Sequence, residues 1–327
     1  MDNLTHSLVG WAIGQAGLKT KTRKGLAALI LAANMPDIDV FFGHSCWEPL
    51  AIHRGFTHGL VGGIVVMPPI LAGLLWLIDR WQAGRGAVFR SGLSMHFGWL
   101  VALCYVGAVT HPLLDLQTSY AVQLLSPFSK AWFHEETLFI IDIWIWAGLS
   151  LAIWLSWRRQ QTGGDWRRPA RVALSVMLLY IGANWLMTIS ARAALRDVLP
   201  PEDTATVFAG FEPVLFWERG LIYRGASGIG HAHWSPFAGL SDLVSPRPDN
   251  MDDPLARTGM FASPELVRFM RWSVMPVATV ERGRCRAVVE YTDARFVNAR
   301  LPWRDEATSV FRHRVELPLP GPGCPAK

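Results

Sequence analysis

Histidine and aspartate side chains recur in five short motifs within the apolar first half of this chain. Imidazole nitrogens and carboxylate oxygens are ligands that proteins offer to divalent metal ions. The motifs contain four histidines and four aspartates: Thr5-His6, Pro36-Asp37-Ile38-Asp39, His53-Arg54-Gly55-Phe56-Thr57-His58, His111-Pro112-Leu113-Leu114-Asp115 and Asp142. Because ionisable side chains are costly beside a bilayer and usually functional there, this set predicts a site with room for more than one ion.

One pair has a spacing suited to chelation. His111 and Asp115 are four residues apart, which places both on one face of a helix, where they could hold one metal ion. The alternative is that His111 only caps a helix before Pro112. His6 near the start of the chain is a further candidate ligand, although a single histidine is more often structural.

A second pair lies in the densest motif. His53 and His58 flank Gly55, which lets the chain turn, so that both imidazoles could face one site. Arg54 could neutralise a phosphate or carboxylate of a substrate. The alternative is a polar loop at the membrane interface, with Arg54 extending towards lipid headgroups.

The remaining candidates are carboxylates in apolar surroundings. Asp37 and Asp39 would repel each other unless a cation lies between them, and one of them could bridge two metals. An N-cap role would account for one of the two, but not for both. Pro36 predicts a break in the helix that precedes them. Asp142 enters an apolar helix and, like His6, could have a structural role instead.

Hydropathy predicts the elements that carry these motifs. Spanning the hydrocarbon takes about 20 apolar residues. Runs of this kind cover residues 59–78, 93–109, 138–157 and 172–189, and shorter apolar stretches cover 8–18 and 25–42. The chain is 51% hydrophobic with a net charge of +5, as expected of a multi-spanning membrane protein rather than a nucleic-acid-binding one, because its arginine excess lies in short loops. Residues 1–8 lack a basic segment, so we expect no cleavable signal peptide.

The basic loops predict an orientation. They form three clusters, which are Lys19, Lys21, Arg23 and Lys24; Arg80, Arg85 and Arg90; and Arg158, Arg159, Arg167, Arg168 and Arg171. Connecting these clusters through the apolar runs places all three on one face, which should be cytoplasmic. The five polar motifs then meet at the opposite ends of the helices, on the non-cytoplasmic side of the inner membrane.

A composition change divides the chain. We expect a helical, transmembrane, metal-binding domain over residues 1–191 and a soluble α+β accessory domain over 192–327 on the same side as the site. Residues 274–280, 286–291 and 309–317 have the residue pattern of strands. The four cysteines, which include Cys46 and Cys104, lack the spacing of a zinc finger, and Cys285 and Cys324 could pair in an oxidising compartment.

The motifs as a set resemble the YdjM-type family of membrane-bound, metal-dependent hydrolases over roughly residues 1–190. The resemblance is carried by five elements: N-L-T-H-S-L-V-G at 3–10, N-M-P-D-I-D at 34–39, H-R-G-F-T-H-G at 53–59, H-P-L-L-D at 111–115 and L-F-I-I-D ending at Asp142. The motif style is also similar to the all-helical zinc-dependent phospholipase C and P1 nuclease group, and this similarity implies a helical bundle with bound zinc. A later His-x-x-x-Glu element of that group is absent here.

These observations predict a membrane-embedded hydrolase that acts on a phosphoester or lipid-linked substrate through a metal-activated water. The expected cofactor is a divalent metal, zinc in one to three ions with two favoured. Its predicted ligands are His6, Asp37, Asp39, His53, His58, His111 and Asp115. Arg54 would hold the anionic group, and Asp39 or Asp142 would act as general base. The alternatives are a metal or proton transporter and a membrane-anchored accessory protein.

Overall fold

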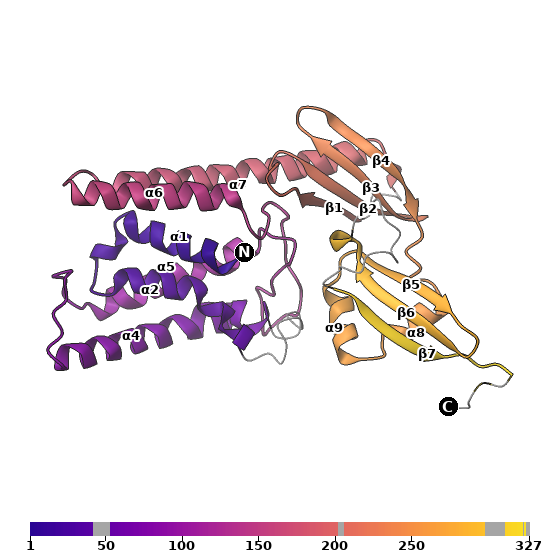
Figure 1. Ribbon diagram of the computed structural model, residues 1–327, viewed down its shortest axis with the longest axis horizontal. Helices are drawn as coiled ribbons and strands as arrows, with labels where there is room; N and C mark the ends of the chain where they lie inside the picture. The colour runs from indigo at the N-terminus through magenta and orange to yellow at the C-terminus, as the bar shows by residue number, and fades with distance from the viewer. Residues whose placement is uncertain (42–52, 202–205, 298–310, 323, 325–327) are drawn as a thin grey trace. The chain divides into compact units, whose positions relative to one another are not determined.

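The computed structural model describes residues 1–41, 53–201, 206–297, 311–322 and 324. It contains two compact units, one formed by Met1–Leu186 with Pro213–Phe216 and the other by Met187–Glu212 with Trp217–Lys327. The first unit is helical and the second contains two antiparallel sheets (Figure 1). Cys46, one of the cysteines considered above, lies outside the described residues.

The first unit is built from helices that run roughly alongside one another (Figure 1). They are α1 (Asn3–Gln15), α2 (Gly25–Asn34), α4 (Met67–Gly84), α5 (Phe97–Asp115), α6 (Ile143–Gln161) and most of α7 (Arg167–Arg196). Asp2 caps α1, since its carboxylate accepts hydrogen bonds from the backbone amides of Leu4 and Thr5. After Asn34 the α-helix gives way to the 3₁₀ segment η2 (Met35–Phe41), so a break lies where Pro36 predicts one, although Met35 itself keeps right-handed helical dihedral angles of φ −62° and ψ −35°.

Three helical stretches in the described part of the chain are long and apolar enough to cross a membrane. They cover Leu60–Gly84, in which the π-helical segment η4 (Leu60–Val66) leads into α4, together with Phe97–Asp115 and Arg167–Arg196. The predicted run at 138–157 becomes helical only from Ile143, and α6 is not among the three. Its tryptophans, serines and terminal arginines explain this difference, because they lower the mean hydropathy of the helix.

Two glycines bring the site-bearing helices together. A Cβ atom added at Gly10 of α1 would lie 2.8 Å from the carbonyl oxygen of Leu29 in α2, and one at Gly107 of α5 would lie 2.6 Å from the same oxygen. Real Cβ atoms do not approach so closely, so α1 and α5 both contact the backbone of α2 at places where only glycine fits. This packing draws the start of α1, the end of α2 and the end of α5 to one place.

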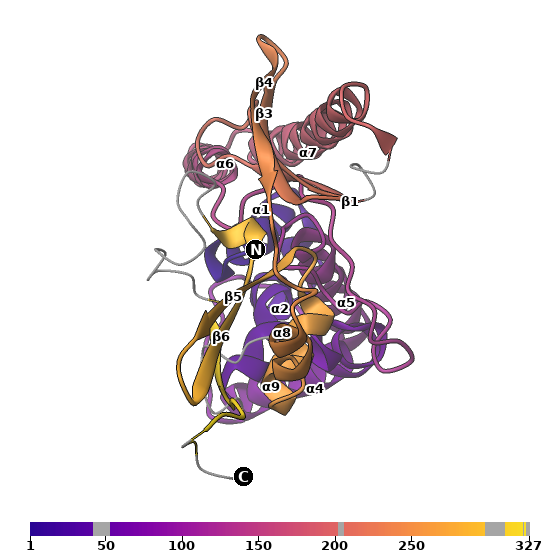
Figure 2. The same ribbon diagram turned by 90° about the vertical axis from the view of Figure 1, so that its right-hand side faces the viewer.

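The second unit contains a four-stranded and a three-stranded antiparallel sheet (Figure 2). The first has the order β1 (Thr206–Phe211), β2 (Arg219–Gly225), β3 (Gly228–Ser235) and β4 (Gly239–Arg247), and the second has β5 (Pro276–Arg282), β6 (Arg286–Asp293) and β7 (His313–Pro318). Two short helices, α8 (Pro254–Gly259) and α9 (Pro264–Trp272), lie between them in sequence. The strands predicted at 274–280, 286–291 and 309–317 correspond to β5, β6 and β7, whereas β1 to β4 were not predicted.

An ion pair and a disulfide hold the second sheet. The buried carboxylate of Asp293 lies 2.9 Å from Arg295, accepts a hydrogen bond from the Ser273 hydroxyl at 2.5 Å and caps neighbouring backbone amides. Cys285 and Cys324 form the disulfide that the sequence allowed, and it ties the chain beyond β7 to the loop between β5 and β6.

Candidate metal centre

The seven residues predicted to bind metal lie together at one end of the helical unit. His6 comes from the first turns of α1, and His111 and Asp115 come from the last turns of α5. Asp37 and Asp39 come from η2, which follows α2. His53 precedes the 3₁₀ segment η3 (Phe56–His58), whose last residue is His58. They fall into three overlapping groups able to hold an ion, which are His6, His111 and Asp115; Asp37, His58 and His111; and Asp39, His53 and His58.

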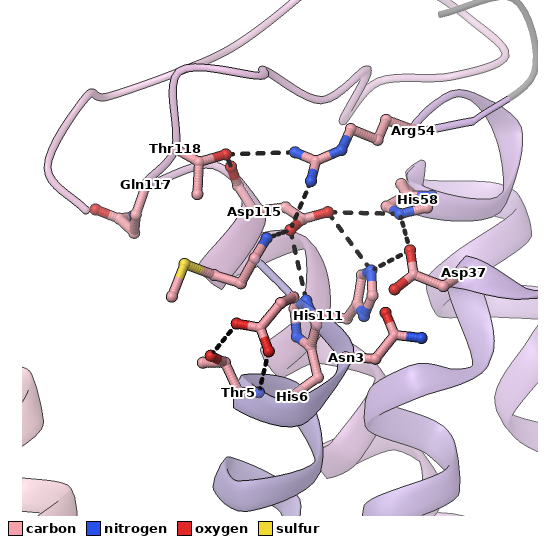
Figure 3. A network of polar contacts seen from close by, with 12 residues as sticks. Asn3, Thr5, His6, Asp37, Arg54, His58, His111, Asp115, Gln117 and Thr118 are labelled. Carbon is pink, nitrogen blue, oxygen red and sulfur yellow. Dashed lines mark hydrogen bonds and ion pairs between the residues drawn. The ribbon is translucent and has the colours of Figure 1, made fainter. Parts of the chain in front are cut away.

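Four ligand atoms lie close together at the centre of the cluster. His58 Nε2 lies 3.2 Å from Asp37 Oδ1 and 3.5 Å from Asp115 Oδ2, and His111 Nε2 lies 3.4 Å and 3.5 Å from the same two atoms (Figure 3). A zinc ion with bonds of 2.0–2.1 Å to four tetrahedral ligands separates those ligands by about 3.3 Å. The four imidazole–carboxylate separations are therefore close to those expected between ligands of one zinc ion.

The tautomer of His111 leaves a lone pair facing this space. Its Nδ1 lies 2.6 Å from the backbone carbonyl oxygen of Ala33, and a carbonyl can only accept a hydrogen bond, so Nδ1 carries the proton. Nε2 of the neutral ring is then an acceptor that faces the carboxylates of Asp37 and Asp115, which are also acceptors. Only a cation or an added proton relieves this contact, and a second ring nitrogen bound to a carbonyl is the usual arrangement of a metal-ligating histidine.

Several polar atoms here are buried without a hydrogen-bond partner among the described residues. They include both ring nitrogens of His6, Nε2 of His111 and Oδ2 of Asp115. His6 stacks on His111 with ring centroids 3.8 Å apart, and its Nε2 lies 3.5 Å from Asp115 Oδ1. Buried polar atoms are rarely left without partners, so unsatisfied donor atoms that face one another fit a bound metal.

Asp115 also contacts fixed positive charge. Arg54 lies with Nη2 3.6 Å from Asp115 Oδ1 and with Nη1 3.3 Å from the hydroxyl of Thr118, and the α-amino group of Met1 pairs with the same carboxylate. Arg54 is buried and adopts the left-handed conformation with φ 63°, a strained backbone that often marks functional sites. The guanidinium predicted to hold a substrate anion is thus directed at Asp115.

The outer part of the cluster is joined by hydrogen bonds. His53 Nδ1 lies 2.7 Å from Asp39 Oδ1, and His53 Nε2 lies 3.9 Å from Asp37 Oδ1. Burial alone would raise the pKa of Asp37, but hydrogen bonds from His111 and His58, which need a proton on each Nε2 when no metal is bound, outweigh burial and hold that pKa below its ordinary value. The pKa of Asp39 is lowered in the same way by His53 and His58. Both carboxylates are therefore charged and available as ligands near neutral pH.

Asp142 is not brought into the cluster by any contact in the described part of the chain. It caps α6, where its Oδ1 accepts hydrogen bonds from the backbone amides of Trp144 and Ile145 at 3.0 Å, and its Oδ2 accepts one from the Tyr180 hydroxyl at 3.0 Å. Asp142 thus has the structural role that was the alternative to a catalytic one. Sequence reasoning gave no role to Thr57, although it lies inside the densest motif, or to Ala33, whose backbone carbonyl carries no signal in its residue type.

Apolar helices of membrane-spanning length together with a buried histidine and aspartate cluster define a membrane protein with a candidate metal centre. The model of the YdjM inner membrane protein family matches residues 1–191, and the chain belongs to that family. It is also similar to a Bacillus subtilis (strain 168) protein named "Uncharacterized protein YfhP", with 23% identity over 254 residues that cover 71% of this chain and 69% of that protein. No solved structure matches significantly, so the similarity to the phospholipase C and P1 nuclease bundle stays a prediction.

Proposed function

We propose that this protein is a metal-dependent hydrolase of the inner membrane that acts on a phosphoester or lipid-linked substrate. The observation that carries the proposal is the set of Asp37, His58, His111 and Asp115, whose imidazole nitrogens lie 3.2–3.5 Å from the carboxylate oxygens, as expected for ligands that share one zinc ion. The mixture of imidazole and carboxylate ligands favours zinc.

A second ion would share a carboxylate with the first. His53 Nε2 faces Asp37 from the outer side of the centre, and the His53 side chain is 19% exposed, whereas that of His58 is fully buried. Catalytic metal sites keep an open position for water or substrate, and this side of the cluster is the better candidate for one. His6, beside Asp115 Oδ1, would complete the opposite side.

The chain's own residues have separable tasks in this proposal. A bound divalent metal would supply Lewis-acid activation of a water molecule. Asp115 would be kept ionised and oriented by Arg54, whose guanidinium would also attract an anionic substrate group. Of the two carboxylates predicted as general base, Asp39 lies in the cluster but uses its oxygens towards His53 and Thr57, and both oxygens of Asp142 cap or brace helices, so we assign the base to neither.

Exposed apolar side chains beside the ligands support a lipid-like substrate. Phe41 lies two residues after Asp39, Phe56 two residues before His58, and Leu113 between His111 and Asp115. Their exposed fractions are 84%, 50% and 54%. Apolar surface around a polar site is typical of proteins that meet membranes or amphiphilic ligands. A transporter would instead place ionisable groups along the path across the membrane, while the described cluster lies at one end of α1, α2 and α5.

The disulfide supports the proposed sidedness. Disulfides persist in oxidising compartments, so the bond between Cys285 and Cys324 favours a non-cytoplasmic position for the second unit. The basic loops favour the same side for the site. A multi-pass chain with its site facing the outer leaflet would have access to lipid-linked substrates.

Phosphate release from the reconstituted protein tests the proposal. Zinc-loaded and chelator-treated protein in nanodiscs would be given phosphatidic acid and soluble p-nitrophenyl phosphate. We expect zinc-dependent release, faster from the lipid, and its loss in His58→Ala and Asp37→Ala. His96→Ala is the matched control, because exposed His96 lies at the other end of α5. Wild-type protein that holds zinc yet hydrolyses no phosphoester in a broad panel would contradict the hydrolase assignment.

A further inference from the structure

Thr57 lies between a carboxylate and a candidate ligand. Its hydroxyl donates a hydrogen bond to Oδ2 of Asp39. The hydroxyl oxygen of Thr57 also lies 3.1 Å from Nδ1 of His58. A hydroxyl has one hydrogen, and an ionised carboxylate can only accept, so the hydrogen is used towards Asp39. Towards His58 the Thr57 oxygen must therefore accept, and Nδ1 of His58 must carry the proton.

This fixes which nitrogen of His58 can bind metal. A neutral imidazole carries one N–H, so a protonated Nδ1 leaves the lone pair on Nε2. That atom is the one that lies 3.2 Å from Asp37 and 3.5 Å from Asp115 at the centre of the cluster. The opposite tautomer would place a hydrogen where the ion should be.

The other carboxylate oxygen of Asp39 fixes which ring nitrogen of His53 carries the proton. Nδ1 of His53 lies 2.7 Å from Asp39 Oδ1, so it donates to this carboxylate and Nε2 is left to face Asp37. The 2.7 Å separation is shorter than the edge of about 3.3 Å expected between two ligands of one tetrahedral zinc ion. It has the length of a charge-assisted hydrogen bond, so these two atoms contact each other rather than a shared ion.

We propose that Thr57 and Asp39 are positioning residues that lie outside the ligand shell. One hydroxyl and one carboxylate hold His53 and His58 with their Nδ1 atoms protonated and aim both Nε2 atoms at Asp37. The inference rests on the proposed metal centre and replaces direct ligation by Asp39 with an indirect role. Partners of this kind typically change metal affinity 10–100-fold when removed.

Zinc affinity of the full-length protein tests this role without any enzymatic readout. Wild type, Thr57→Val, Thr57→Ser and Asp39→Asn would be titrated in detergent against a fluorescent zinc chelator. We expect Thr57→Val and Asp39→Asn to bind zinc about 10–100-fold more weakly. Thr57→Ser keeps the hydroxyl and should stay close to wild type. Thr22→Val is the matched control, because the Thr22 hydroxyl is also buried and hydrogen-bonded but contacts Met95 and the amide of His96.

Each outcome bears on the inference. Thermal unfolding in chelator would establish that Thr57→Val is folded, and serine rescue separates the hydroxyl from packing. Unchanged affinity in folded Thr57→Val, or an equal loss in Thr57→Ser, overturns the positioning role while zinc binding by wild type leaves the proposed function standing. A wild-type protein that binds no zinc overturns both.

Discussion

Replacing each of the two central carboxylates by its amide should separate metal binding from internal charge balance. Asp115 faces Arg54 and the Met1 amino group as well as the candidate ion, whereas the ion-pair partners of Asp37 among the described residues are imidazoles. Asp115→Asn leaves the buried Arg54 guanidinium without its counter-charge, which costs about 3–5 kcal/mol even without metal. Asp37→Asn keeps a polar side chain beside the imidazoles and removes repulsion from Asp39, so its metal-free cost should stay near 1 kcal/mol.

Thermal unfolding with chelator and with zinc measures both effects. At about 2–4 °C per kcal/mol, metal-free Asp115→Asn should unfold roughly 6–20 °C below wild type and metal-free Asp37→Asn within about 4 °C of it. Zinc at 1,000 times its dissociation constant would stabilise wild type by about 4 kcal/mol. Neither variant should show that gain.

Two results would refute this reasoning. Equal melting temperatures of the two variants in chelator would mean that Arg54 does not depend on Asp115. A zinc-induced rise in Asp37→Asn as large as that in wild type would remove Asp37 from the ligand set.

Three further predictions concern packing, pH and the disulfide. Gly107→Ala should destabilise the protein by about 1–3 kcal/mol and weaken zinc binding, because its Cβ would press on the Leu29 carbonyl. Gly98→Ala on the same helix has open space around it and should do neither. Thermal unfolding and zinc titration of both variants check this. Burial opposes ionisation of Asp293, but Arg295 and Ser273 outweigh it and hold its pKa below the ordinary value. Its stabilisation is therefore present above about pH 4 and lost as the pH falls further, and Asp293→Asn should lower the melting temperature at pH 7 but change it little at pH 3. Cys285→Ser should cost up to about 4 kcal/mol, given the sequence separation of 39 between the cysteines, and reductant should reproduce the loss in wild type but leave the variant's melting temperature unchanged.

Local sequence rules predict many of the site's residues, but they do not predict how the distant segments that carry them come together. The four-residue spacing of His111 and Asp115 is a property of a helix and is visible in sequence. Their meeting with His58 depends on Gly10 and Gly107, which let α1 and α5 contact α2 closely. Glycines also occur in helices without such contacts, so their presence in the sequence does not predict this packing. Asp142 shows the opposite difficulty, since an acidic residue at the start of an apolar helix has the same sequence pattern whether it binds metal or caps the helix.

The second unit shows a similar division. The strands β5 to β7 carry alternating or β-branched residues, which predict strands directly. The strands β1 to β4 contain Gly210, Gly220 and Gly230, which disfavour strands by propensity. Gly230 is required there by packing, because a Cβ atom at this position would lie 2.2 Å from the ring of Tyr223 on the neighbouring strand. Contacts between strands decided this sheet, and they are not encoded within any one segment.

Metal content combined with X-ray absorption tests the central claim most directly. Wild-type protein purified without chelator should carry stoichiometric zinc with only nitrogen and oxygen neighbours at about 2.0 Å, and His58→Ala and Asp37→Ala should lose it while His96→Ala keeps it. Folded wild type that contains no metal after zinc loading, or zinc with sulfur neighbours, would contradict a metal centre built from Asp37, His58, His111 and Asp115.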